Sequence, residues 1–182
     1  MIKNSKFSKE INQRVIKEQR LRVGYVKGKN SRPSFKVLDR QNTKWLKQVL
    51  RQNGWPTISL VGKKASEGAW LLTQHADQDI LFQKKVLQLL KKAYGKNSRD
   101  IQKWQIAYLT DRILKNQKKS QHFGTQTIKD ARQGKYYLWP VIDPKNLNKR
   151  RKLFNLITSE KYLTSINKNW AKYLKKPKYK KS

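Results

Sequence analysis

Histidine and carboxylate side chains are the groups in this sequence that could carry acid–base chemistry, and they are few. The 182 residues contain two histidines, His75 and His122, and eleven aspartates and glutamates. His75 and Asp77 stand two positions apart, in Gln74-His75-Ala76-Asp77. Because imidazole titrates near neutral pH, a histidine beside a carboxylate could move protons at a reaction centre. The simpler interpretation is a histidine at a helix end that hydrogen-bonds a carbonyl oxygen.

Asp111 is the second candidate, because it interrupts the apolar face of a predicted helix over 101–115. It lies on the stripe formed by Ile101, Trp104, Ala107, Tyr108 and Leu114. A lone buried carboxylate is costly, so we expect Asp111 to have a partner. A structural ion pair or a helix cap is the favoured interpretation, and a catalytic role is the alternative.

Arg150 and Arg151 follow Asp143-Pro144 closely and could bind an anion. The arginine side chain is suited to gripping a carboxylate or a phosphate with two hydrogen bonds. In a chain with so few acids, we expect one of the two to pair with Asp143, Asp77 or Asp111. The turn at 123–126 could present backbone N–H groups to an anion, although a glycine in a turn usually serves backbone geometry alone.

Metal and cofactor chemistry has little support in the sequence. Two imidazoles and a carboxylate could hold a metal ion, yet no HExxH or similar spacing is present. The chain has no cysteine, which excludes disulfides, thiolate metal ligands and cysteine nucleophiles. The motifs GxxxxGK[ST], GxGxxG and GxSxG are also absent. The sequence therefore predicts neither a metal nor a cofactor.

The strongest signal is positive charge. Lysine and arginine number 44 against eleven acids, for a formal net charge of +33. Such a field attracts polyanions, with nucleic acid as the usual partner and an anionic membrane surface as the second. A lysine-rich proteome would explain why lysine outnumbers arginine, but it explains less well why acidic residues are so scarce. The charge favours phosphate contacts that are mostly independent of base sequence.

Hydrophobic periodicity predicts a mainly α fold, a compact bundle of about five to seven helices with one short β-hairpin near residues 122–139. Residues 23–36 contain two glycines and Pro33, and they predict a loop. Pro56 predicts a non-helical connector over 54–60. The helices are expected over about 5–20, 42–52, 64–76, 80–93, 101–115, 145–154 and 159–174.

The predicted organisation has three parts within the length of one ordinary domain. Residues 1–36 form an N-terminal helix and a basic loop, 37–157 a helical core, and 158–182 a C-terminal helix with a lysine-rich tail. No apolar run approaches the roughly 20 residues that span a bilayer, and no apolar signal segment is seen at the N-terminus. We therefore expect a cytoplasmic protein, and the sequence leaves its oligomeric state open.

A series of short motifs runs along the chain in a fixed order. They are GWPTISLVG (54–62), AWLLTQHAD (69–77), FQKKVLQLL (82–90), AYLTDR (107–112), FGTQ (123–126), DP (143–144) and NKRR (148–151). Together they resemble a bacterial family, domain-of-unknown-function family 6624. Upstream, Glu18-Gln19 with Arg22, and Asp39 with Asn42-Thr43, also resemble the family's leading helices, so the similarity spans roughly 10–155. This chain departs from the family's typical charge, being basic nearly everywhere outside the motifs.

The resemblance implies a helical domain with a short β element and implies no activity. It also marks the positions that the patterning singles out, and we hypothesise that these converge on one polar cleft. The catalytic candidates are His75, Asp77 and Asp111. The binding candidates are Trp55, Tyr108, Arg112, Thr125, Gln126, Asp143, Arg150 and Arg151.

Three functions remain open from the sequence. The first is a basic module that contacts nucleic-acid phosphates without strong sequence specificity, and the charge favours it. The second is a small hydrolase or transferase-like enzyme that uses His75 with Asp77 or Asp111, and Arg150 or Arg151 as an anion clamp. The third is an interaction protein for an acidic partner.

Overall fold

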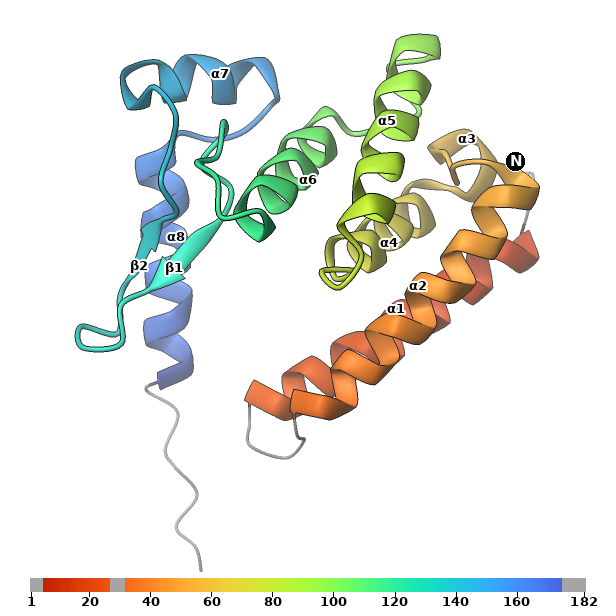
Figure 1. The fold of residues 1–182 in the computed structure, drawn as a ribbon, viewed down its shortest axis with the longest axis horizontal. Helices are drawn as coiled ribbons and strands as arrows, with labels where there is room; N and C mark the ends of the chain where they lie inside the picture. Colours follow the sequence, from red (N-terminus) through yellow and green to blue (C-terminus); the bar gives the residue numbers. More distant parts are fainter. Residues whose placement is uncertain (1–4, 27–31, 175–182) are drawn as a thin grey trace, which may run out of the picture. The chain divides into compact units, whose positions relative to one another are not determined.

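The computed structural model describes residues 5–26 and 32–174 (Figure 1). The chain divides into two compact units, Met1–Leu109 and Thr110–Ser182. Eight α-helices and one two-stranded sheet occur in the described residues, which confirms the mainly α fold with a short hairpin. The division into three parts expected from composition stays a prediction, and its lysine-rich tail lies outside the described residues.

The first unit is built around packing of the N-terminal helix α1 on its neighbours. Helix α1 contacts α2, α3 and α4. Phe7 and Ile11, on the apolar stripe of α1, are buried. Gly68 lets α4 approach this stripe closely, because an added Cβ would lie 3.0 Å from Cγ2 of Ile11. The helices of this unit are α1 (Ser5–Val26), α2 (Arg32–Asn53), α3 (Ile58–Val61), α4 (Lys63–Gln74), α5 (Ile80–Lys96) and the start of α6 (Lys103–Asn116).

Two boundaries differ from those expected. Helix α1 continues to Val26 and α2 begins at Arg32, so residues 23–26 and 32–36 of the predicted loop are helical, and its other residues lie outside the described ones. The physical reason is that Pro33 is the second residue of α2, and proline's missing N–H has no helical partner to lose in the first turn. Asp39 therefore lies inside α2. Residues 58–61, expected as part of a connector, form the short helix α3.

The second unit begins in α6 and continues with the hairpin of β1 (Thr127–Lys129) and β2 (Tyr136–Leu138). The strands are antiparallel, with Thr127 opposite Leu138. A short 3₁₀ helix, η1 (Pro144–Asn146), leads into α7 (Leu147–Leu153), and α8 (Ser159–Leu174) packs against β2. The side chain of Asn167 on α8 accepts from the N–H and donates to the carbonyl of Tyr136, which fixes α8 to the hairpin.

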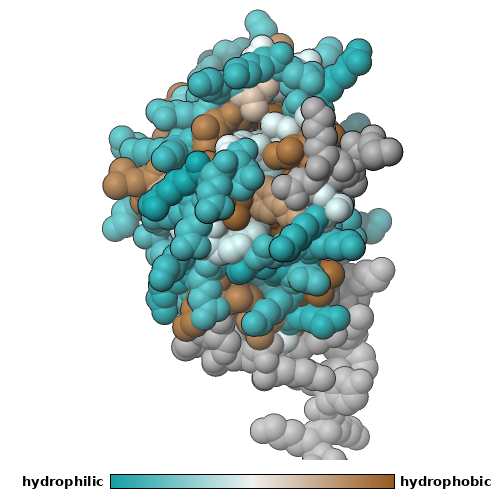
Figure 2. Space-filling model, turned by 90° about the vertical axis from the view of Figure 1, so that its right-hand side faces the viewer, coloured by the Kyte–Doolittle hydropathy of each residue, from teal (hydrophilic) through white to brown (hydrophobic). Residues whose placement is uncertain are grey.

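The surface is strongly polar. On the face shown in Figure 2, hydrophilic side chains cover most of the area, with hydrophobic side chains in separate small patches. Among the helices of the described residues, none has both the length and the apolar composition needed to cross a bilayer.

Candidate functional site

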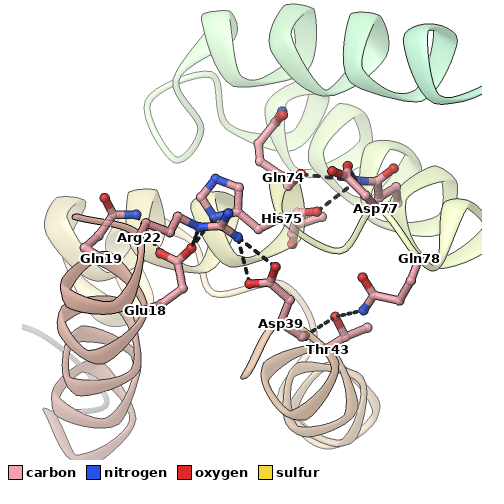
Figure 3. Close-up of polar contacts among 11 residues, drawn as sticks. Glu18, Gln19, Arg22, Asp39, Thr43, Gln74, His75, Asp77 and Gln78 are labelled. Carbon is pink, nitrogen blue, oxygen red and sulfur yellow. Dashed lines mark hydrogen bonds and ion pairs between the residues drawn. The ribbon is translucent and has the colours of Figure 1, made fainter. Parts of the chain in front are cut away.

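His75 meets charged side chains from two other helices of the first unit (Figure 3). It ends α4 as the C-cap residue, and its Nδ1 lies 2.7 Å from Oε1 of Glu18 on α1. The distance is that of a hydrogen bond, although the ring is turned so that an Nδ1–H would not point straight at the oxygen. Asp39 on α2 completes the group, with one oxygen within 4.8 Å of both other ligand-type atoms.

Arg22 links the two carboxylates. Its Nε donates to Oε1 of Glu18, and its Nη2 donates to both oxygens of Asp39 at 2.8 Å. The guanidinium also lies over the ring of Phe35, 4.7 Å from the ring centre. We call Glu18, Arg22, Asp39 and His75 the four-residue cluster; it joins α1, α2 and α4.

The two carboxylates of this cluster titrate differently. Burial acts to raise the pKa of Glu18, but the contacts with His75 and Arg22 outweigh it and leave the pKa below its ordinary value. Burial raises the pKa of Asp39, and the opposing effect of Arg22 does not fully compensate. The cluster therefore shifts the pKa values of its two carboxylates in opposite directions.

Glu18 is fully buried for a reason visible in its position on α1. It continues the apolar stripe of Phe7, Ile11 and Val15 at helical spacing. The argument that singled out Asp111 applies equally to Glu18, so the signal was present in the sequence. The resemblance named Glu18 and Arg22, but spacing alone could not identify His75 as their partner.

The second imidazole nitrogen, Nε2, is oriented differently. No hydrogen bond joins it to any other described residue, and it is not among the buried polar atoms. Figure 3 shows one ring nitrogen directed away from Glu18 and Asp39. A histidine held by a buried carboxylate at one nitrogen, with the other accessible, can accept a proton from a bound molecule.

The cluster also has the composition of a metal site. Glu18, Asp39 and His75 each offer one ligand atom. Arg22, however, already places a positive charge on both carboxylates. A divalent cation would have to displace that guanidinium, so the geometry favours acid–base chemistry over metal binding.

A basic face on α2 adjoins the cluster. Arg40, Lys44, Lys47 and Arg51 follow one another at helical spacing of four, three and four residues. The first three line a cavity of about 220 Å³ together with Thr43 and Gln78. Lys47 and Arg51 also line a second cavity of about 310 Å³, with Lys85 of α5. We call these five cations and their two cavities the basic groove.

Hydrogen bonds connect the basic groove to the cluster. Oγ1 of Thr43 donates to the backbone carbonyl of Asp39 at 2.7 Å and accepts from Nε2 of Gln78 at 3.1 Å (Figure 3). Within the groove, Lys47 pairs with Asp79, whose other oxygen caps α5 by accepting from the N–H of Phe82. Burial opposes these two contacts, but the pKa of Asp79 still falls below its ordinary value.

Asp111 performs a different task in the second unit. It is fully buried and accepts from the backbone N–H groups of His122, Phe123 and Thr125, and from the Thr125 hydroxyl, at 2.8 to 3.1 Å. Burial nevertheless raises the pKa of Asp111 above its ordinary value. Its partners are loop backbone groups, so the carboxylate serves as a cap for residues 122–125.

Arg150 and Arg151 hold the carbonyl groups of the same loop. Arg151, only 1% exposed, donates through Nη1 to the carbonyls of Phe123 and Gly124 and through Nε to that of Ile157. Nε of Arg150 donates to the carbonyl of His122, and its Nη1 pairs with Asp143 at 3.0 Å. The N–H groups of the loop therefore donate to Asp111, and its carbonyl groups accept from the two arginines.

The other binding candidates join structural contacts of the two units. Arg112 donates to Oε1 of Gln126 at 3.2 Å. In the first unit, Trp55 is buried, and Tyr108 packs edge-on against Trp70 with 6.0 Å between ring centres. Oδ1 of Asp77 accepts from Gln83 at 3.5 Å, while His75 meets Glu18 and Asp39. The candidates of the first unit thus make separate contacts, those of the second unit surround one loop, and the single polar cleft stays a hypothesis.

The comparison with protein families agrees with the motif series. A family model described as "Family of unknown function (DUF6624)" matches residues 10–175. The chain belongs to this family. The match includes all the candidate residues of both units and extends into α8. No curated protein and no solved structure matches the chain.

Proposed function

We propose that this protein binds the phosphates of nucleic acid, without strong sequence specificity, through the basic groove of its first unit. The observation that carries the proposal is the row of Arg40, Lys44, Lys47 and Arg51 along one face of α2. At 1.5 Å per residue the row is about 16 Å long. Successive cations are about 5 Å apart along the helix axis, so several of them can contact one polynucleotide strand.

The chain's overall charge supports the same proposal. A net charge of +33 creates a field that raises the local concentration of polyanions and speeds their association. Phosphate contacts contribute affinity without reading base edges, so the groove predicts binding to many sequences. Only Lys47 among the four cations has an acidic partner in the described residues, and it lies between the two cavities.

The test is binding to labelled single-stranded and double-stranded oligonucleotides over a series of salt concentrations. The variant Arg40→Gln, Lys44→Gln, Arg51→Gln removes three exposed cations of the groove and leaves the Lys47–Asp79 pair intact. Each lost phosphate contact reduces the slope of log K against log salt by about 0.9 for duplex DNA. We therefore expect the slope to fall by about 2 to 3.

A matched control removes the same charge elsewhere. Lys63, Lys64 and Lys91 are exposed and line neither cavity, so Lys63→Gln, Lys64→Gln, Lys91→Gln has the same net charge as the groove variant. Equal losses in the two variants would show that only net charge matters and would refute the groove. Absence of binding by the native chain at near-physiological salt would refute the function itself.

A further inference from the structure

We propose that His75 is the general base of a catalytic site in the first unit, and that its substrate is the phosphodiester backbone of RNA. This inference rests on the proposed binding of nucleic-acid phosphates. It adds an activity to that function and assigns the four-residue cluster to it.

The first argument is the way that His75 is held. Nδ1 lies 2.7 Å from Oε1 of Glu18, a carboxylate with no exposed surface, although an Nδ1–H would not point straight at that oxygen. When Nδ1 carries the proton, Nε2 has its lone pair available, and a carboxylate on Nδ1 also stabilises the imidazolium that forms next. Nε2 has no hydrogen-bond partner among the residues described. The His75 side chain is 19% exposed and Nε2 is not among its buried atoms, so a bound substrate can reach it. Glu18 acts through His75 and is a positioning residue.

The second argument is the charge around the imidazole. Glu18 and Arg22 face it from α1, and Asp39 faces it from α2. With both carboxylates ionised and Arg22 positive, the cluster carries one uncompensated negative charge while His75 is neutral. An imidazolium that forms on His75 during the reaction would lie beside that negative charge.

The third argument is the position of the basic groove. Arg40, which lines the groove, follows Asp39 directly, and Gln78 lies three residues after His75. Thr43 and Gln78 are hydrogen-bonded to each other, and Thr43 also bonds the backbone of Asp39. A polynucleotide held along α2 by its phosphates would therefore pass beside the cluster.

RNA suits a site of this kind because it carries its own nucleophile. Nε2 of His75 accepts the proton of a 2′-hydroxyl, and the 2′-oxygen forms a bond to the adjacent phosphorus. The bond from phosphorus to the 5′-oxygen breaks, and that oxygen takes a proton from solvent. The imidazolium returns its proton to solvent, so no other reactant is consumed. The products end in a 2′,3′-cyclic phosphate and a 5′-hydroxyl, and the intramolecular attack needs only orientation and removal of one proton.

The experiment measures cleavage of a short fluorogenic RNA by the full chain, His75→Ala and Glu18→Gln, with binding measured in parallel. We expect products with cyclic phosphate ends, and no cleavage of the same sequence with a 2′-deoxy sugar at the cleaved position. His75→Ala should lose about 10²- to 10⁴-fold in kcat while keeping its affinity. Added imidazole should restore part of that loss. Glu18→Gln should misplace the imidazole of His75, and we therefore expect kcat to fall by about 10²-fold with little change in KM.

The possible outcomes distinguish failure of this inference from failure of the proposed phosphate binding on which it rests. Binding without cleavage by the native chain, or equal cleavage by His75→Ala, overturns the catalytic site and leaves phosphate binding standing. Absence of binding overturns both. Because Glu18→Gln removes a buried charge and can unfold the protein, circular dichroism accompanies each assay. If Glu18→Gln is unfolded, the deciding measurement is whether imidazole restores cleavage to folded His75→Ala. Failure to restore it counts against the proposal.

Discussion

Replacing Asp111 by asparagine tests whether this carboxylate is structural. Its Oδ1 accepts from the N–H groups of His122 and Phe123, and its Oδ2 from those of Phe123 and Thr125 and from the Thr125 hydroxyl. Asparagine has one oxygen and an amide NH₂, which donates. In the better of its two orientations, the N–H of Thr125 faces another donor, while the hydroxyl can rotate to accept.

The magnitude follows from these bonds. A buried donor left without an acceptor costs about 1 to 3 kcal/mol, and a hydrogen bond to a charged group contributes about 1.5 to 3 kcal/mol. Relief of the buried charge returns part of this free energy. We expect Asp111→Asn to lower the free energy of unfolding by about 3 kcal/mol, measured by urea denaturation with circular dichroism, and to speed hydrogen exchange in residues 122–125.

The matched control is Asp130→Asn in the hairpin turn. Asp130 also accepts two backbone N–H groups, from Arg132 and Gln133, but these two bonds are exposed and water can replace either of them. Its variant should stay within about 0.5 kcal/mol of the native chain. A loss of less than about 0.5 kcal/mol in Asp111→Asn would refute the capping role and favour the catalytic alternative.

Three further predictions concern packing, the buried arginine and pH. Gly68→Ala should destabilise the fold by about 1 kcal/mol. Overpacking against Ile11 costs about 1 to 3 kcal/mol, and alanine's higher helix propensity recovers up to about 1 kcal/mol of it. A raised melting temperature would contradict this prediction. Arg151→Lys should lower the free energy of unfolding by about 2 kcal/mol or more, because lysine cannot reach three carbonyls from one planar group. An unchanged thermal midpoint together with lost anion binding would instead favour a role for Arg151 in binding an anion. The N–H of Glu160 itself and the Ser159 hydroxyl lower the pKa of Glu160 to about 2, so carboxyl NMR should show a midpoint there, and a midpoint above 4 would refute these bonds. Because this pKa is lowered in the folded state, the associated stability is complete above the ordinary value of 4.5 and is lost as the pH falls toward 2.

Local patterns in the sequence were enough to predict most of the helices and the hairpin. The stripe of Phe7 and Ile11 and the apolar face around Asp111 are set by helical periodicity, which does not depend on distant residues. The prediction of a loop at Pro33 was wrong, because proline both ends helices and begins them, and only the fold selects between the two.

The partners of the polar residues depended on tertiary structure. The sequence alone established that Asp111, His75 and the two arginines needed explanation, and that the chain is strongly basic. It could not show that His75 meets Glu18 of α1, or that Asp111 accepts from the N–H groups and Arg151 donates to the carbonyl groups of one loop. These contacts join residues distant along the chain, and their free energy arises only when helix packing excludes water and brings the partners of each buried charge within reach.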